Sequence, residues 1–374
     1  MATILVAVTH LLGAGHLTRA AALARALAAD GHAVTLASGG MPAPRLDLGG
    51  AALSQLPPVR VFGTAFGDLR DVDGAPAGPA LLGRRREVLA GLARDLRPDA
   101  IVTELYPFGR RALADEFEAL LAARGAARIL ASIRDVLAVP GRPDRIARTH
   151  ARLAEAYDAV LVHGDPDFLP LEASWPLDPG LAGKLAYTGY VDEGAPATPL
   201  AAAAAGAVVV SGGSSAAGLP LQAAALEAAR LVPERAFLVL VGRGVADADF
   251  AALADRAPPN ARVERARPDF RGLIASAAVS VSQAGYNTAV DLLRARARAV
   301  LVPFEAGRET EQRLRAEAMA RAGLGTVLPE AGLSGPSLAA AVRAALAEPG
   351  PAAHGIALDG AARAAAVVAR LLGR

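Results

Sequence analysis

Short apolar runs alternate with longer helix-like patterns along almost the whole chain. The first pair is Ile4–Val8, which reads as a strand, and Leu17–Ala29, whose apolar spacing is that of a helix. Asp30-Gly31 follows, and Gly31 is the expected C-cap of that helix. Repeated strand–helix alternation is typical of a parallel sheet covered by helices. We therefore expect an α/β fold.

The alternation is interrupted once and then restarts, which predicts two domains. Residues 193–206 are rich in Ala, Pro and Gly and read as a linker between domains 1–192 and 207–356, each Rossmann-like, with their parallel sheets facing a central cleft. Residues 357–374 are expected to form a helix that crosses back to the first domain. In the first domain we expect further strands at Val34–Ala37, Ala100–Thr103, Arg128–Ser132, Ala159–His163 and Leu185–Val191, and helices at Arg86–Leu96, Ala112–Arg124 and Pro143–Tyr157. In the second we expect strands at Val208–Val210, Phe237–Val241, Arg262–Glu264, Ala278–Val281 and Val300–Val302, and helices at Pro220–Leu231, Ser337–Ala347 and Leu358–Leu372.

Composition narrows the class of protein. The 374 residues suit two domains, and 53% hydrophobic against 20% charged residues excludes a disordered chain. A net charge of +2 and 4% aromatic residues argue against a nucleic-acid partner. No cysteine is present, so disulfides, thiolate metal sites and thiol nucleophiles are excluded. The N-terminal run lacks the basic region of a signal peptide, and no stretch is apolar enough to cross a bilayer. We expect a cytoplasmic protein, and leave open a peripheral contact at the inner face of the membrane.

The stretch Ser282–Asp291 carries the strongest functional signal. A buried strand is expected to end at Gly285, and a helix is expected to begin at Tyr286. A strand, a turn of small residues and a helix N-terminus together direct main-chain N–H groups and the positive end of the helix dipole at a bound anion. The strand at Val300–Val302 leads through Phe304–Thr310 into another helix. Because neighbouring parallel strands end at one edge, where open α/β sheets bind ligands, we interpret this edge as a nucleotide-sugar pocket.

The loop Thr9–Arg19 carries the second signal. Its Gly13-Ala-Gly15 superficially matches a dinucleotide fingerprint, but Thr18 stands where the third glycine belongs. No acidic residue ends the second expected strand either, which disfavours NAD binding. What remains is a flexible loop that presents His16 at the sheet edge, where a neutral imidazole can accept a proton from a hydroxyl. The alternative is that His16 only caps or packs against the helix start.

Several motifs occur together in one order. They are Gly13-x-Gly-His-Leu-x-Arg19, Ser38-Gly-Gly40, Ser211-Gly-Gly-Ser214, Gly285-Tyr-Asn-Thr-x-x-Asp291 and Glu311-Gln312. Together they resemble the MurG-like glycosyltransferases of the GT-B fold, and most closely a poorly characterised bacterial branch of predicted glycosyltransferases. The resemblance covers nearly the whole chain, and the block from Gly285 to Gln312 is its most specific part. It implies a GT-B architecture with the acceptor in the N-terminal domain and the donor nucleotide in the C-terminal one.

The resemblance also implies roles for individual residues. His16 matches the general base, and Ser211–Ser215 matches the loop that contacts the donor diphosphate through main-chain N–H groups. Asp291 stands where the family has a glutamate that binds the ribose hydroxyls; alternatively, Thr288-x-x-Asp291 is a variant capping box. Gln312 matches a donor-sugar contact, and Glu311 is either a second contact or a solvated helix charge. The expected donor-binding set is Gly13, Gly15, Ser211, Gly212, Gly213, Ser214, Ser215, Arg267, Phe270, Gln283, Ala284, Gly285, Tyr286, Asn287, Thr288, Asp291, Glu311 and Gln312.

Other polar residues have weaker assignments. Glu104, Tyr106, His163 and Asp165 end first-domain strands and are acceptor-side candidates, with a structural turn as the alternative at His163 and Asp165. Asp71-Val-Asp73 and Asp247-Ala-Asp249 spell a two-carboxylate metal pattern, but we interpret both as surface charge in loops. We expect no metal and no cofactor. The arginine triplet Arg84–Arg86 is interpreted as a solvated face or, alternatively, as a contact for a phosphate or an anionic membrane surface.

The resulting hypothesis is an inverting, metal-independent glycosyltransferase. It moves a sugar from a UDP-sugar to a hydroxyl or another nucleophile of an unknown acceptor, with His16 as the base. Three alternatives stay open: a nucleotide-sugar hydrolase that uses His16 to activate water, a sugar epimerase of the same fold, and a non-catalytic nucleotide-sugar-binding module.

Overall fold

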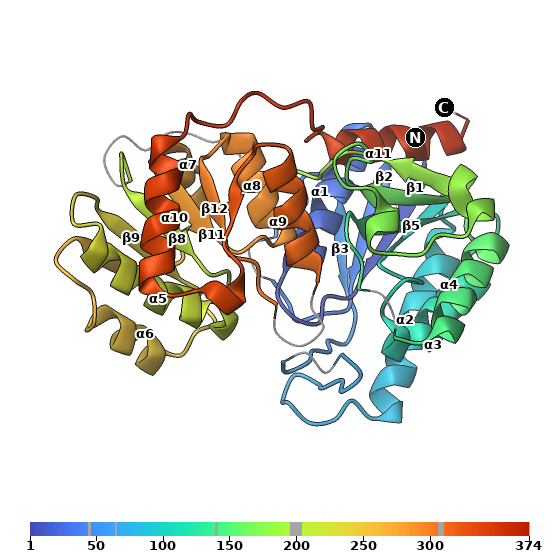
Figure 1. The fold of residues 1–374 in the computed structure, drawn as a ribbon. Helices are drawn as coiled ribbons and strands as arrows, with labels where there is room; N and C mark the ends of the chain where they lie inside the picture. The colour runs from blue at the N-terminus through green and yellow to red at the C-terminus, as the bar shows by residue number, and fades with distance from the viewer. Residues whose placement is uncertain (44–45, 64–65, 139–140, 195–203, 306–309, 374) are drawn as a thin grey trace. The chain divides into compact units, whose positions relative to one another are not determined.

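The chain folds into two compact units. The computed structural model describes residues 1–43, 46–63, 66–138, 141–194, 204–305 and 310–373. Unit 1 comprises Met1–Glu193 together with Ile356–Arg374, and unit 2 comprises Gly194–Gly355 (Figure 1). Residues 195–203 of the expected linker lie outside the described residues.

Unit 1 is built on a seven-stranded sheet in which all neighbouring strands are parallel. The strand order is β3-β2-β1-β4-β5-β6-β7. The strands are β1 (Thr3–Val8), β2 (Ala33–Ser38), β3 (Ala52–Gln55), β4 (Ala100–Glu104), β5 (Arg128–Arg134), β6 (Ala159–His163) and β7 (Leu185–Tyr187). The helices are α1 (Gly15–Ala29), α2 (Pro79–Leu96), α3 (Ala114–Ala122), α4 (Pro143–Ala156) and α11 (Gly360–Leu371), with short 3-10 turns at Arg111–Leu113, Leu171–Ala173 and Pro179–Lys184.

Helices cover both faces of this sheet, because alternate strand residues point to opposite sides. In β1, Leu5 and Ala7 join the core beneath α2, α3 and α4. Ile4, Val6 and Val8 join a second core beneath α1 and α11 (Figure 1). Burial on both faces explains why β1 reads as a continuous apolar run and not as an alternating one.

Unit 2 repeats the layout on a six-stranded parallel sheet with the order β10-β9-β8-β11-β12-β13. Its strands are β8 (Val208–Ser211), β9 (Phe237–Val241), β10 (Ala261–Arg265), β11 (Val279–Ser282), β12 (Ala299–Leu301) and β13 (Thr326–Val327). Its helices are α5 (Leu219–Leu231), α6 (Asp247–Ala254), α7 (Phe270–Ser276), α8 (Tyr286–Ala295), α9 (Glu311–Arg321) and α10 (Gly335–Ala347), with 3-10 turns at Ala216–Gly218 and Glu330–Gly332. Helices α5 and α10 pack together over one core of the sheet. The fold is therefore α/β, with two Rossmann-like domains, as the sequence predicts.

Some expected elements were wrong in detail. The edge strand β3 was missed because its side chains are largely exposed and carry no apolar pattern. The segment with Asp247 and Asp249 is not a loop but the first turn of α6, where acidic side chains complement the helix dipole. The strand expected over Leu185–Val191 ends at Tyr187, and Tyr190 is buried beyond it.

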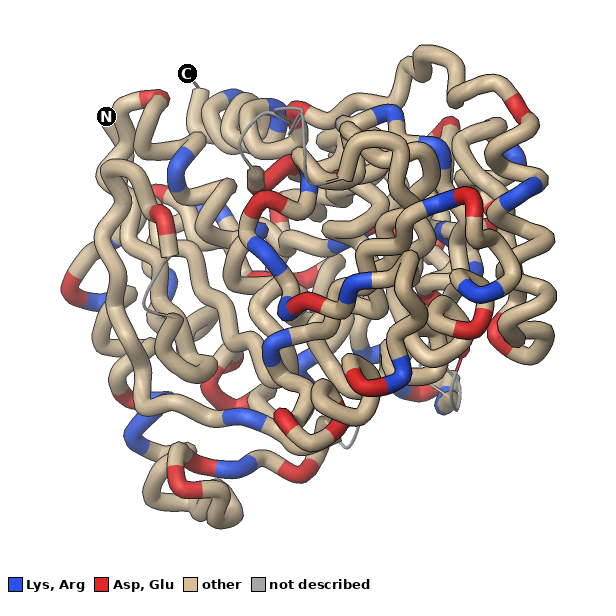
Figure 2. Tube along the Cα trace, turned by 90° about the vertical axis from the view of Figure 1, so that its left-hand side faces the viewer, with Lys and Arg blue, Asp and Glu red and all other residues tan. Residues whose placement is uncertain are grey.

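The arginine triplet is not a solvated face throughout. Arg85 is fully buried, and its guanidinium donates to both carboxylate oxygens of Glu116 at 2.8 Å and to the carbonyl oxygen of Gly39 at 2.7 Å. A buried arginine requires such partners because an unpaired charge in the core is very costly. Elsewhere, basic and acidic residues alternate along the trace without a large area of one sign (Figure 2).

Candidate active site

The two sheets each reverse their strand order at one place, and the predicted site residues gather there. In unit 1 the chain runs outward from β1 to β3, and then outward on the other side from β4 to β7. The neighbours β1 and β4 therefore lead into loops that diverge, which leaves a ligand crevice at their carboxyl ends. His16 follows β1 in the first turn of α1, and Glu104 is the last residue of β4.

His16 and Glu104 contact each other at this point. His16 Nδ1 lies 2.8 Å from Glu104 Oε1, and the side chains are 15% and 1% exposed. Arg19, one helical turn after His16, donates to the same carboxylate oxygen. Arg19 Nη2 is also 2.9 Å from His16 Nδ1. Because an ionised carboxylate only accepts, His16 Nδ1 must carry the proton to bond Glu104 Oε1, and we assign the proton of the neutral imidazole to Nδ1. With this assignment the contact with Arg19 Nη2 is a close approach and not a hydrogen bond. His16 Nε2 then keeps a free lone pair.

The surroundings keep this imidazole neutral. Burial lowers the pKa of His16 to about 3, the Glu104 carboxylate opposes that shift, and the cationic Arg110 and Arg19 add to it. Although burial raises the pKa of Glu104, Arg19 and the hydrogen bonds from His16 and Ser132 hold it well below its usual range. At neutral pH the pair is therefore an uncharged base beside an ionised carboxylate.

The sequence suggested that Glu104 contacts the acceptor, but the structure does not place its carboxylate to do so directly. Its second oxygen, Oε2, accepts a hydrogen bond from Ser132 Oγ at 2.5 Å, and Ser132 Oγ lies 2.9 Å from His163 Nε2. His163 is fully buried, so it is not an acceptor contact either. Arg19 and Ser132 were not predicted as site residues, although both lie in segments that the sequence singled out. Arg19 closes the first motif, and Ser132 ends an expected strand.

The other two acceptor candidates have structural contacts. The Tyr106 ring stacks on Phe117 with centroids 4.7 Å apart, and its hydroxyl donates to Glu118. Asp165 Oδ1 accepts from the main-chain N–H of Asp167 at 3.0 Å, which is the structural turn that was the alternative. Tyr106 as an acceptor contact was therefore wrong, because the aromatic ring completes the core.

In unit 2 the strand order reverses between β8 and β11. The loop Ser211–Ser215 leaves β8, with Gly213 at φ +76° and Ser214 and Ser215 exposed. A side chain on Gly212 would lie 2.5 Å from Gly218 Cα, so the loop folds back on itself more closely than any other residue permits. Gln283 follows β11 and donates to the carbonyl oxygen of Ala217 at 3.2 Å, which ties the two loops together.

Gln312 joins the next pair of strand ends. Its Oε1 accepts from the main-chain N–H groups of Ala284 at 3.0 Å and Phe304 at 3.1 Å. Glu311 is buried and pairs with Arg315 at 3.0 Å, so a solvated helix charge was wrong. Arg315 also donates to the carbonyl oxygen of Ala284 at 2.7 Å. These contacts hold the turn before α8 through side chains that the sequence assigned to the donor sugar.

Asp291 is not part of a capping box. The N-cap of α8 is Gly285, so Thr288 lies inside the helix, where it cannot cap. Arg271 of α7 donates to Asp291 Oδ1 through Nη2 at 2.6 Å and Nε at 2.8 Å. The side chain of Asp291 remains 22% exposed, so the pair stays accessible from one side. Arg271 was missed because α7, which carries it, was not predicted.

The remaining donor candidates are divided between the two units. Gly13 has φ +67°, Gly15 begins α1, and Asn287 is exposed in the first turn of α8. Arg267 pairs with Asp269 and Glu264 through its side chain, and Phe270 begins α7. Tyr286 is buried, with the Arg315 guanidinium 5.7 Å from its ring centroid.

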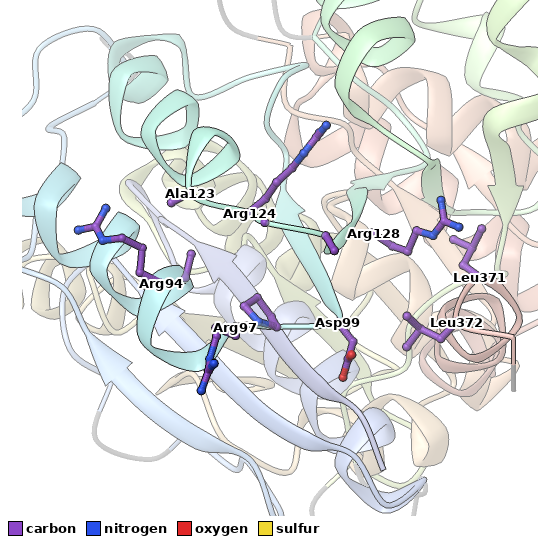
Figure 3. Close-up of a pocket in the computed structure, with 12 residues that line it drawn as sticks. Arg94, Arg97, Asp99, Ala123, Arg124, Arg128, Leu371 and Leu372 are labelled. Carbon is purple, nitrogen blue, oxygen red and sulfur yellow. The ribbon is translucent and has the colours of Figure 1, made fainter.

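A pocket in unit 1 lies away from these residues. It opens at the amino ends of β4 and β5, the opposite sheet edge from Glu104, and is lined by Arg94, Arg97, Asp99, Arg124, Arg128, Leu371 and Leu372 among others. The labelled arginines in Figure 3 point in different directions and do not converge on one point. This pocket has no arrangement suited to holding a compact anion.

The described residues contain neither a metal-binding cluster nor a membrane-spanning helix. In that part of the chain, no group of three or more His, Asp or Glu side chains is placed to hold a metal ion. Nor does any described helix combine the length and apolar character required to span a membrane.

Comparisons with known proteins agree with this geometry. Residues 207–366 match the glycosyltransferase family 28 C-terminal domain. No sequence among the curated proteins matches the chain. The fold is similar to the calicheamicin glycosyltransferase CalG4 (19% identity, TM-score 0.67, covering 100% of this chain and 99% of that one). It is also similar to MurG of Acinetobacter baumannii (18% identity, TM-score 0.61, covering 99% of this chain and 100% of that one). A further similar structure is the glycosyltransferase VinC in complex with dTDP (16% identity, TM-score 0.61, covering 99% of this chain and 95% of that one). The chain therefore has the GT-B fold that the sequence resemblance predicts, and residues 207–366 match the C-terminal domain of family 28 glycosyltransferases.

Proposed function

We propose that the protein transfers a sugar, with inversion and without a metal ion, from a UDP-sugar to a hydroxyl group of its acceptor. The observation that carries this proposal is the buried contact of His16 with Glu104 at the strand-order reversal of unit 1. A neutral imidazole with one orienting carboxylate is the arrangement that general-base catalysis requires.

In the proposed step, His16 Nε2 accepts the proton of the acceptor hydroxyl while its oxygen attacks the anomeric carbon. The bond from that carbon to the diphosphate oxygen breaks, and the electron pair leaves with the nucleoside diphosphate. Glu104, which remains ionised, stabilises the imidazolium that forms. Because attack and departure occur on opposite sides, the anomeric configuration inverts.

Main-chain groups of unit 2 would bind the donor. Gly213, Ser214 and Ser215 are consecutive exposed residues of this loop, and α8 follows the adjacent strand β11 with its positive dipole end. Such groups stabilise the negative charge that develops on a departing diphosphate. The resemblance to MurG favours uridine, whereas the similar VinC was solved with dTDP, so the base is the part of this proposal that most needs a test.

Turnover assays would test the proposal. The protein is incubated with UDP-sugars and dTDP-sugars and a panel of hydroxyl-bearing acceptors in the presence of EDTA. We expect UDP release that depends on an acceptor, persists in EDTA and yields a product of inverted anomeric configuration. Equal UDP release without acceptor would indicate a hydrolase, a rearranged donor would indicate an epimerase, and binding without turnover would indicate a sensor module.

We also propose that the protein is cytoplasmic. Fractionation of cells would test this location, and recovery of the protein with the membranes would point to a peripheral contact instead.

A further inference from the structure

A row of buried polar side chains continues from Glu104 across the sheet of unit 1. Ser132 Oγ lies 2.5 Å from Glu104 Oε2, His163 Nε2 lies 2.9 Å from Ser132 Oγ, and Thr188 Oγ1 lies 2.8 Å from His163 Nδ1. Ser132 is in β5, His163 ends β6, and Thr188 directly follows β7. Glu104 and Ser132 are register partners on adjacent strands, so the row follows the carboxyl edge of the sheet.

This row lies in the interior of the unit. Ser132, His163 and Thr188 are 1%, 0% and 0% exposed, so an acceptor would not reach them. Buried polar groups destabilise a fold unless each finds a hydrogen-bond partner, and a connected set of them fixes one arrangement of its members. Apolar residues would fill these positions at lower cost if packing were their only role.

The proton positions in the row follow from the number of donors. Ser132 has one hydroxyl proton and faces both a carboxylate oxygen and His163 Nε2. If Ser132 donated its proton to His163, lone pairs of Ser132 Oγ and Glu104 Oε2 would face each other at 2.5 Å. Ser132 therefore donates to Glu104. His163 then donates through Nε2–H to Ser132, which leaves its Nδ1 as an acceptor. The Thr188 hydroxyl lies nearest to this nitrogen, at 2.8 Å, and is farther from the carbonyl oxygens of Gly189 (3.0 Å) and Val162 (3.3 Å).

Burial keeps the His163 ring in this neutral form. Burial lowers its pKa to about 3; Arg19 lowers it further and Glu104 opposes the shift. A neutral ring carries one N–H, and the donor count places that proton on Nε2. His16 and His163 therefore hold opposite tautomers: His16 donates to Glu104 directly, and His163 donates to Ser132, which in turn donates to Glu104.

We propose that His163, acting through Ser132, is a positioning residue for the base His16. Ser132 and His163 hold Glu104 so that its Oε1 accepts the Nδ1–H of His16, which leaves His16 Nε2 free for the acceptor proton. The inference extends the proposed function and rests on it, but the tautomers themselves do not depend on turnover.

Nitrogen NMR of the histidine rings in the full chain tests the tautomers directly. The chain has 6 histidines, so the signals of His16 and His163 can be assigned with His16→Gln and His163→Gln. We expect Nδ1–H for His16 and Nε2–H for His163, and a mixture of tautomers at His16 in Ser132→Ala. An Nδ1–H tautomer at His163, or a His16 tautomer that is the same with and without the Ser132 hydroxyl, would overturn the proposal.

Kinetics test the consequence. We expect Ser132→Ala and His163→Leu to lower kcat about tenfold at unchanged KM for the donor, because the loss of one such hydrogen bond raises the barrier by a comparable factor. His163→Gln retains an N–H near the Nε2 position and should lose less. His150→Gln is the matched control, because His150 is half-buried in the same unit and bonds Trp175 outside the row. If His163→Gln and His163→Leu lowered kcat by the same factor, His163 would serve only in packing, which would contradict the proposal.

Two failures can be told apart. If the wild type turns over no nucleotide sugar, the proposed function fails while the tautomers still decide whether the row is ordered as inferred. If His163→Leu does not fold, His163→Gln and the wild-type tautomers still provide the test. Thermal unfolding of every variant identifies that case.

Discussion

The two strand-order reversals of this molecule share one topology and differ in chemistry. At the β1/β4 reversal of unit 1, titratable side chains contact one another in the interior: His16, Glu104 and Arg19. At the β8/β11 reversal of unit 2, the exposed residues include Gly213, Ser214 and Ser215 of the loop and Asn287 in the first turn of α8. One sheet edge is thus suited to moving a proton and the other to holding a diphosphate. Side-chain substitutions should therefore affect chemistry in unit 1, whereas backbone geometry should control binding in unit 2.

Replacement of the base should give the largest effect. We expect His16→Gln to lower kcat by about 10²- to 10⁴-fold, the usual contribution of a positioned base. Steady-state kinetics with saturating donor measure it. Activity within a few-fold of wild type would contradict a role for the imidazole and would leave His16 as a packing residue at the helix start.

Nucleotide affinity should fall when the backbone of the donor loop is displaced and should stay nearly unchanged when a serine hydroxyl is removed. Gly212→Ala places a Cβ 2.5 Å from Gly218 Cα, so the loop must shift, and we expect nucleotide affinity to fall by about tenfold or more. Ser214→Ala is the control, since it keeps the main-chain N–H and should change affinity less than twofold by calorimetry. A larger loss in Ser214→Ala than in Gly212→Ala would show that side chains, not backbone, bind the diphosphate.

The buried histidines of unit 1 should make its stability depend on pH. Burial lowers the pKa values of His16 and His163 from 6.5 to about 3. Between these values the unfolded chain binds protons that the folded chain does not, so the free energy of unfolding falls as the pH drops from about 6.5 toward 3. Urea titrations at a series of pH values measure this slope, and His163→Gln should reduce it. A slope that the substitution leaves unchanged would show that His163 does not titrate in this way.

Asp291 should give the smallest of these effects. Asp291→Asn removes the charge that pairs with Arg271, and we expect nucleotide affinity to fall by less than tenfold, because an ion pair that solvent still reaches from one side contributes little. Arg262→Ala, which breaks an exposed ion pair with Glu264, is the control and should leave affinity unchanged. Equal affinity in Asp291→Asn and wild type would remove Asp291 from the ribose site.

Much of the fold follows from local pattern, whereas the contacts of the site do not. The apolar run of β1 and the turn at Gly285 identify their elements, because burial on both faces and the break of a strand leave direct marks in the sequence. Glu104 and His163 were each found at a strand end, and His16 was found in the loop after the first strand. Their hydrogen bonds were not, since residues 16 and 104 meet only through the pairing of β1 with β4.

Charged residues were the hardest to interpret. Arg85 read as part of a solvated face but is fully buried, because Glu116 pairs with it inside the fold. A solvated helix charge was one interpretation of Glu311, which is buried against Arg315. Tyr106 read as a ligand contact, yet it stacks on Phe117. Whether a polar residue faces solvent, a ligand or a buried partner depends on residues distant in sequence, and no local pattern records them.

Calorimetric titration of UDP and dTDP into wild type, His16→Gln and Gly212→Ala tests the division of roles most directly. The account predicts that UDP binds to the wild type in the presence of EDTA, binds equally to His16→Gln, and binds at least about tenfold more weakly to Gly212→Ala. Tighter binding of dTDP would change the donor base but keep the division. Loss of nucleotide binding in His16→Gln together with normal binding in Gly212→Ala would contradict it.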